Sequence, residues 1–108
     1  MNGLDDIIMF FKAKLAENGL NVAKIVLFGS HANGNADKES DLDLVVISGD
    51  FQNKNIFERV NLIGDARASV VKNFRVPVDI LLMTPEEFEN EKSPVADECR
   101  DGIVVYAA

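Results

Sequence analysis

Two neighbouring stretches decide how this chain folds: residues 27–34 read LFGSHANG, and residues 40–46 read SDLDLVV. The first ends an apolar run with a Gly-Ser turn, and the second opens another apolar run with two aspartates two residues apart. Short apolar runs bounded by Gly and polar residues are typical of buried strands. We therefore expect strands at residues 24–28 and 42–47, joined by a polar loop that starts with one helical turn at residues 31–33.

Helical and strand patterns alternate along the whole chain. The expected helices are residues 3–17 and about 55–73, with two short ones that begin at Thr84-Pro85 and Ser93-Pro94; the expected strands are 24–28, 42–47, 76–83 and 103–106, and residues 51–55 form a linker. Apolar residues at a spacing of three and four predict the helices, and the capping pairs Thr-Pro and Ser-Pro predict where the short ones start. This alternation predicts an α/β sheet with helices packed on it, in a single domain over residues 1–108.

The composition argues against two classes of partner. The formal net charge is −7, without the basic stripe that phosphate contacts require, so we expect no direct nucleic-acid binding. Arg67, Lys72 and Arg75 are interpreted as solvated charges near a helix end. The apolar runs are too short to span a bilayer, and the single cysteine, Cys99, excludes an intramolecular disulfide, so we expect a cytoplasmic protein without membrane association.

Three aspartates are candidates for a metal site. Asp41 and Asp43 stand two residues apart at the start of a strand, so both side chains face the same side, where they repel each other unless a cation lies between them. Asp79 lies within the most apolar stretch of the chain, where burial of a lone carboxylate is costly. If the two strands are neighbours, the three carboxylates provide hard oxygen ligands for one or two Mg²⁺ ions. The alternatives are an exposed pair of strand-end acids, and a single buried acid that accepts backbone hydrogen bonds.

The Gly29-Ser30 turn is a candidate phosphate site. Gly allows a ligand to approach the backbone closely, and the amides that follow lie at the start of a short helix, where anions are favoured. The hydroxyl of Ser30 adds a donor for a phosphate oxygen. A lone Gly-Ser is usually only a turn, but here an Asp-x-Asp on a buried strand follows closely.

These motifs together resemble the signature of the polymerase-beta-type nucleotidyltransferase superfamily. The matching positions are Gly29-Ser30-x-Ala32-x-Gly34, Ser40-Asp41-x-Asp43-Leu44-x-Val46, and Asp79 on a later apolar strand. The small size is similar to that of the minimal nucleotidyltransferases, which are partners of HEPN-domain proteins in prokaryotic toxin–antitoxin modules. The resemblance covers nearly the whole chain and implies a small mixed β-sheet with the active site at one edge.

The resemblance also implies roles for individual residues. Gly29, Ser30 and Ser40 would hold a nucleoside triphosphate such as ATP, and Asp41, Asp43 and Asp79 would bind the catalytic Mg²⁺. Asp79 would also help to activate the attacking hydroxyl group. The implied reaction transfers a nucleoside monophosphate to that hydroxyl and releases pyrophosphate.

The sequence departs from the family pattern at His31 and Asn33, where members often carry basic residues that hold phosphates. Three functions therefore compete. The first is an adenylyl-transferring enzyme that modifies a HEPN toxin, and the second is an antitoxin that masks its toxin by binding alone. The third is a small-molecule nucleotidyltransferase of the antibiotic-modifying kind, which the lack of room for a substrate domain disfavours. The presence of all three acids favours the first.

The oligomeric state is left open by the sequence. Phe88, Val95 and Ile103 fit either a core or an interface, so a homo-oligomer is compatible with the sequence.

Overall fold

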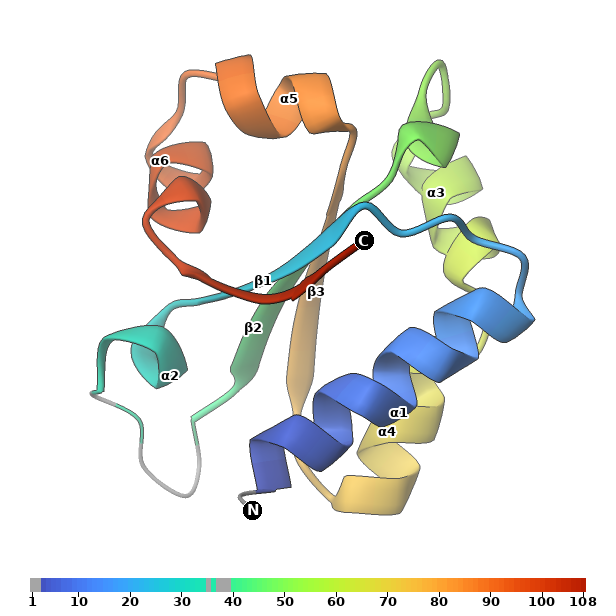
Figure 1. Ribbon diagram of the computed structural model, residues 1–108, viewed down its shortest axis with the longest axis vertical. Helices are drawn as coiled ribbons and strands as arrows, with labels where there is room; N and C mark the ends of the chain where they lie inside the picture. Colours follow the sequence, from blue (N-terminus) through green and yellow to red (C-terminus); the bar gives the residue numbers. More distant parts are fainter. Residues whose placement is uncertain (1–2, 35, 37–39) are drawn as a thin grey trace.

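The fold is a four-stranded β-sheet with helices on both faces (Figure 1). The computed structural model describes residues 3–34, 36 and 40–108. The elements in chain order are α1 (Gly3–Glu17), β1 (Lys24–Phe28), α2 (Ser30–Asn33), β2 (Leu42–Ile47), the 3₁₀ turn η1 (Gly49–Phe51), α3 (Ile56–Ile63), α4 (Ala66–Phe74), β3 (Val78–Met83), α5 (Pro85–Asn90), α6 (Pro94–Arg100) and β4 (Ile103–Ala107). The expected class, an α/β fold with a small mixed sheet, is confirmed.

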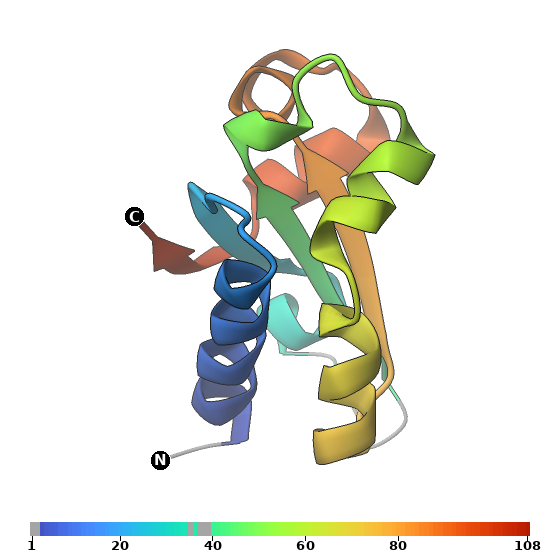
Figure 2. The same cartoon turned by 90° about the vertical axis from the view of Figure 1, so that its right-hand side faces the viewer.

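The strands lie in the order β3-β2-β1-β4. β1 pairs antiparallel with both β2 and β4, whereas β2 and β3 are parallel. The crossover between the parallel strands passes through α3 and α4, as a parallel connection requires. β3 and β4 are therefore the two edges of the sheet, and Figure 2 shows them at its opposite ends.

Each face of the sheet has its own apolar core. Alternation along β2 sends Leu44 and Val46 toward α1 and α4, where Phe11 and Leu15 are fully buried. The other face of the sheet packs against α5 and α6 through a second set of buried residues, namely Val26, Phe28, Val45, Ile47, Met83, Phe88, Ala96 and Cys99. The central strands are thus buried on both faces, as their apolar runs predict.

The expected boundaries of α1, β1 and β2 match the structure residue for residue, and the N-caps Asn55, Thr84 and Ser93 all accept hydrogen bonds from the first turns of their helices. The single long helix over 55–73 is wrong. It is two helices, because Gly64 adopts φ 57° and ψ −129°, outside the helical region.

Two smaller corrections concern a strand and a linker. β3 begins at Val78 rather than at residue 76, beyond Pro77, and the start of the expected linker at residue 51 is instead the end of the 3₁₀ turn. Among the described residues, no helix is both long enough and apolar enough to cross a bilayer.

Candidate active site

Three aspartates lie near the start of β2 and β3, and Asp79 is the neighbour of each of the other two. The parallel register pairs Asp43 directly with Asp79, so both side chains project to the same face of the sheet. Asp41 precedes β2 by one residue, and its carboxyl group lies within hydrogen-bonding reach of that of Asp79 when one of the two is protonated. Asp43 is half-buried, whereas Asp41 and Asp79 are exposed. The structure thus brings together three acids that are up to 38 positions apart in sequence.

The exposure of Asp79 corrects the expectation that it is a buried acid in an apolar strand. β3 is an edge strand, and its first residues alternate between buried Val78 and exposed Asp79. The cost of burying a carboxylate is therefore no argument that Asp79 binds a metal. Its position beside Asp43 and Asp41 is what links it to a site.

The acids raise one another's pKa values. The pKa of Asp41 lies above its usual value, first because of the hydrogen bond with Asp79 and then because of the charge of Asp79. Burial is the main cause that raises the pKa of Asp43, and the charges of Asp79, Asp41 and Glu98 add to it. A cation placed among these groups would offset this repulsion.

The carboxylates suit a hard divalent cation by their chemistry, since Mg²⁺ prefers oxygen ligands. Within residues 3–34, 36 and 40–108, however, no three His, Cys, Asp or Glu side chains lie close enough together to form a ready-made metal site. Asp41 and Asp79 instead contact each other directly. The donor set therefore fits Mg²⁺, and binding would require the carboxyl groups to separate around the ion.

Gly29 forms the wall opposite the acids. It follows β1, precedes α2, and adopts φ 73° and ψ −153°, a region that only Gly populates readily. A Cβ atom at this position would lie 2.3 Å from Oδ2 of Asp43. The antiparallel register that pairs Phe28 with Asp43 causes this close approach. The missing side chain of Gly29 thus lets the carboxylate of Asp43 pack directly against the backbone of this turn.

Ser30 and Ser40 lie on either side of the loop between β1 and β2. Ser30 opens α2, and Nε2 of His31 is 3.2 Å from the carbonyl oxygen of Ser40. His31 therefore connects α2 to the residue that precedes Asp41. Its charge also lowers the pKa of Asp43. Although His31 replaces a basic residue of the family pattern, it lies within electrostatic reach of the acids.

Two charged residues near the site were not among its predicted members. Arg67 was interpreted as a solvated helix charge, but its Nε donates to the carbonyl oxygen of Val78 (2.7 Å), and its charge lowers the pKa of Asp41. Glu98 on α6 raises the pKa of Asp43. Only the packing of α4 and α6 against the sheet brings Arg67 and Glu98 near the aspartates. No local sequence motif could therefore have identified them.

The space beside Gly29 is small and open to one side. A cavity of about 130 Å³ is lined by Phe28, Gly29, Ala32, Asn33, Glu98, Asp101 and Gly102. Pockets that enclose small ligands usually measure about 300–1,000 Å³. None of the three aspartates lines this cavity, and two of them, Asp41 and Asp79, are exposed at the surface.

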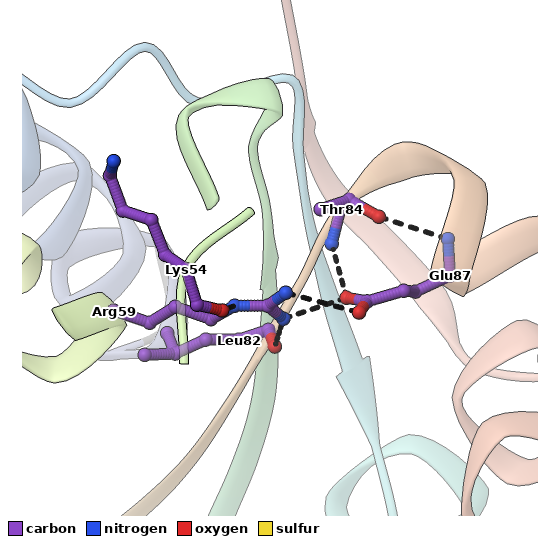
Figure 3. Close-up of polar contacts among 5 residues, drawn as sticks. All are labelled: Lys54, Arg59, Leu82, Thr84 and Glu87. Atoms are coloured by element: carbon purple, nitrogen blue, oxygen red, sulfur yellow. Dashed lines mark hydrogen bonds and ion pairs between the residues drawn. The ribbon is translucent and has the colours of Figure 1, made fainter. Parts of the chain in front are cut away.

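A larger cavity, of about 500 Å³, lies at the other end of the sheet, next to Arg59 and Glu87. Figure 3 shows why we do not assign it a ligand: the guanidinium group of Arg59 already donates to both carboxylate oxygens of Glu87 (2.7 and 3.0 Å) and to the carbonyl oxygens of Lys54 and Leu82. The Arg59–Glu87 ion pair connects α3 to the start of α5. It is a structural contact far from the acids in the sheet.

Comparison with known proteins identifies the family. The profile of the nucleotidyltransferase domain family matches residues 8–102, and no curated protein matches the chain. Among solved structures, a toxin–antitoxin with AMP-PNP shares 17% identity at a TM-score of 0.66, covering 96% of this chain and 73% of the other. A protein from Sulfolobus solfataricus, assigned as a nucleotidyltransferase, shares 21% identity at a TM-score of 0.62 (96% and 86% covered).

A third similar structure is the tri-AMPylated HEPN toxin of Shewanella oneidensis in complex with its MNT antitoxin. The identity is 17% and the TM-score 0.56, with 100% of this chain and 74% of the other covered. At these identities the three structures establish the fold, and the profile match establishes the family. The chain belongs to the nucleotidyltransferase domain family.

Proposed function

We propose that this nucleotidyltransferase moves AMP from ATP to a hydroxyl group of a HEPN-domain toxin and thereby acts as its antitoxin. The observation that carries the proposal is the strand register that pairs Asp43 with Asp79, with the carboxyl group of Asp41 next to Asp79 and the backbone of Gly29 against Asp43. The similar solved structures include a toxin–antitoxin with AMP-PNP and an AMPylated HEPN toxin with its MNT antitoxin, which supports the choice of nucleotide and partner.

Mg²⁺ is the cofactor of this proposal, and Asp41, Asp43 and Asp79 would hold it. Bound there, one or two ions would neutralise phosphate charge and favour departure of pyrophosphate. Their positive charge would also offset the repulsion among the carboxylates, which adds to the hydrogen bond in raising the pKa of Asp41 and to burial in raising the pKa of Asp43.

The remaining roles are those that the family resemblance implies. Gly29 lets the triphosphate approach the backbone of the turn, and the hydroxyl groups of Ser30 and Ser40 donate to its oxygens. The oxygen of the acceptor hydroxyl forms a bond to the α-phosphorus as the bond to pyrophosphate breaks. The hydroxyl proton passes to the carboxylate of Asp79, which is exposed and therefore reachable by an acceptor on another protein.

The open geometry favours a protein acceptor over a small molecule. Asp41 and Asp79 are exposed at the surface, where an acceptor on another protein can reach them, and the cavity of about 130 Å³ beside Gly29 includes none of the three aspartates. A partner surface that covers this corner would exclude water and complete the site. The sole cysteine, Cys99, is buried and forms no disulfide, which fits the cytoplasmic location that we propose for this protein and its toxin.

The test is transfer of AMP from α-labelled ATP to the protein encoded by the neighbouring gene, which the proposal expects to be a HEPN-domain protein. We expect label and a mass increase of whole AMP units on the partner, dependent on Mg²⁺. The double variant Asp41→Asn with Asp43→Asn should abolish transfer, whereas Asp6→Asn, an exposed aspartate in the first turn of α1, should leave it unchanged. Absence of label from a correctly folded pair would overturn the enzymatic proposal.

The second candidate is an antitoxin that acts by binding alone. It is favoured by one observation, namely that the described residues contain no ready-made group of three metal ligands. The same double variant separates the two functions. If it still blocks the ribonuclease activity of its partner as well as the wild type does, masking accounts for the inhibition; if inhibition is lost while binding is retained, modification accounts for it.

A further inference from the structure

The two edges of the sheet differ in how they are protected. In β3, the carbonyl oxygens of Pro77 and Met83 accept from the β2 side, so those of Val78 and Leu82 point outward. The side chains of Arg67 and Arg59 donate to these two outward carbonyls at 2.7 and 3.1 Å. Charged side chains therefore cap the β3 edge, which is a common way to prevent association through an edge strand.

The β4 edge has no such protection. Its sequence, IVVYA, contains no charge and no proline, and no hydrogen bond joins its outer side to any other residue that the structure describes. Ile103 and Val104 are 48% and 52% exposed. Figure 2 shows β4 at the free end of the sheet, with α1 alongside and no helix beyond it. An uncharged and exposed edge strand is a template for pairing with another chain.

An apolar groove continues this edge onto α1. A cavity of about 530 Å³ lies between the two elements, lined by Asp5, Ile8, Met9, Val104 and Val105. The side chain of Met9 is 68% exposed. We refer to Met9, Ile103 and Val104, with the groove between them, as the β4 surface.

Opposite charges lie at the two ends of the β4 surface. Asp5 lines the groove beside Val104, whereas Nζ of Lys12 lies 4.9 Å from the ring centroid of Tyr106, toward the other end of the strand. α1 and β4 therefore run side by side, with an acid near the start of the strand and a base near its end. Such a surface complements a copy of itself in antiparallel orientation, because each acidic end then faces a basic end.

We propose that two copies of this chain associate through their β4 surfaces, antiparallel about a twofold axis, with Asp5 of each copy facing Lys12 of the other. This goes beyond the proposed transferase function, because it concerns the chain without its toxin. Repulsion between two chains of net charge −7 is screened beyond about 8 Å at physiological ionic strength, whereas the apolar contact is not.

The bulge in β4 limits the form that this association takes. Ile25 pairs with Tyr106 and Val26 with Val104, so Val105 is an extra residue that bends the strand. Long continuous pairing through hydrogen bonds is therefore disfavoured, and side chains such as Met9 and Val104 supply most of the contact. An interface in which the same patch meets itself closes after two copies, so it gives dimers rather than filaments.

The first test is sedimentation equilibrium of the chain alone, from micromolar to millimolar subunit concentration. We expect a reversible monomer–dimer equilibrium. Met9→Lys and Val104→Lys, which place a charge in the apolar surface, should shift it to monomer. The matched control is Phe57→Lys on α3, which is 77% exposed but lies outside the surface and should leave dimerisation unchanged. Because Met9 is exposed on a helix, its variant keeps the test valid even if Val104→Lys fails to fold.

The second test uses the charge pattern. Asp5→Lys and Lys12→Asp should each raise the dimer dissociation constant, on the order of ten-fold, because the twofold axis changes two ion pairs at once. The double variant should restore wild-type dimerisation, since each reversed charge then faces its opposite.

Three outcomes would overturn the proposal. They are a wild-type chain that stays monomeric into the millimolar range, a dimer that persists in both Met9→Lys and Val104→Lys, and a double charge reversal that does not restore dimerisation. A monomer whose β4 variants bind the toxin less well would assign the surface to that partner instead, and would also overturn self-association.

Discussion

Replacing Gly29 with alanine tests how the backbone positions the acids. At φ 73° and ψ −153°, a residue with a side chain is strained by about 1–3 kcal/mol. The added Cβ would also lie 2.3 Å from Oδ2 and 3.2 Å from Cγ of Asp43, so the carboxyl group must move. The strain alone should lower the midpoint of thermal unfolding by roughly 4–12 °C for a chain of this size.

The effect on transfer should be larger than the effect on stability. Displacement of a reacting group by about 1 Å can reduce a rate on the order of 100-fold. We therefore expect Gly29→Ala to remain folded at 20 °C but to lose nearly all AMP transfer, measured as the initial rate with α-labelled ATP at saturating Mg²⁺.

The matched control is Gly19→Ala. Gly19 also has a positive φ, 82°, but a Cβ there would meet nothing within 4 Å, and the residue follows α1 rather than β1. This variant should unfold at a lower temperature while its transfer rate at 20 °C stays at the wild-type level. A Gly29→Ala protein that retains the wild-type rate would refute the reasoning, because the contact with Asp43 would then be irrelevant to the site.

Three further predictions concern two residues at the Arg59–Glu87 end of the sheet and the buried cysteine of α6. Hydrogen bonds from Arg59 lower the pKa of Glu87 below its usual 4.5. The pair therefore stabilises the fold above that pH, and this contribution is lost as the pH falls through the lowered pKa. Glu87→Gln should lower the free energy of unfolding by about 1 kcal/mol at pH 7, and urea unfolding of the variant and the wild type should give the same free energy at low pH. Thr84→Ala removes a buried N-cap that accepts from the backbone N–H of Glu87, and urea unfolding should reveal a loss of about 1–2 kcal/mol. Burial raises the pKa of the Cys99 thiol to about 11, so a disulfide reagent at pH 8 should label it only after denaturation; rapid labelling of the native chain would contradict its burial.

The sequence predicted the elements whose signals are local. The helix over Gly3–Glu17 has a regular apolar face and a glycine stop, and the two central strands have apolar runs bounded by polar residues. Thr84 was identifiable as a cap because Pro85 follows it directly and a glutamate follows three residues later. These features depend on neighbours in the chain, so they can be read without the fold.

The break between α3 and α4 could not be predicted in this way. The apolar pattern continues across Gly64, but Asn18, at the end of α1, donates from Nδ2 to the carbonyl oxygen of Ile63 at 2.8 Å. A Cβ on Gly64 would lie 2.8 Å from that same Nδ2. A residue 45 positions away therefore packs against the end of α3, and no local pattern records it.

The sequence identified the three aspartates of the candidate site, but not their exposure or the charged residues around them. Spacing identified Asp41 and Asp43 as a pair, but only the sheet order reveals that Asp79 is exposed on an edge strand. Likewise, the charges of Arg67 and Glu98 reach the acids only because α4 and α6 pack against opposite faces of the sheet. Sheet order and helix packing are tertiary properties that residue spacing does not specify.

The most direct test of the central claim, that the acids at the start of β2 and β3 hold a divalent cation with a nucleotide, is paramagnetic broadening of amide resonances by Mn²⁺ in the presence of AMP-PNP. We predict selective broadening at Gly29, Asp43 and Asp79, and its loss in Asp43→Asn. Broadening centred instead on the acidic residues 86–91 of α5 and its C-cap, or a pattern unchanged in Asp43→Asn, would contradict the account.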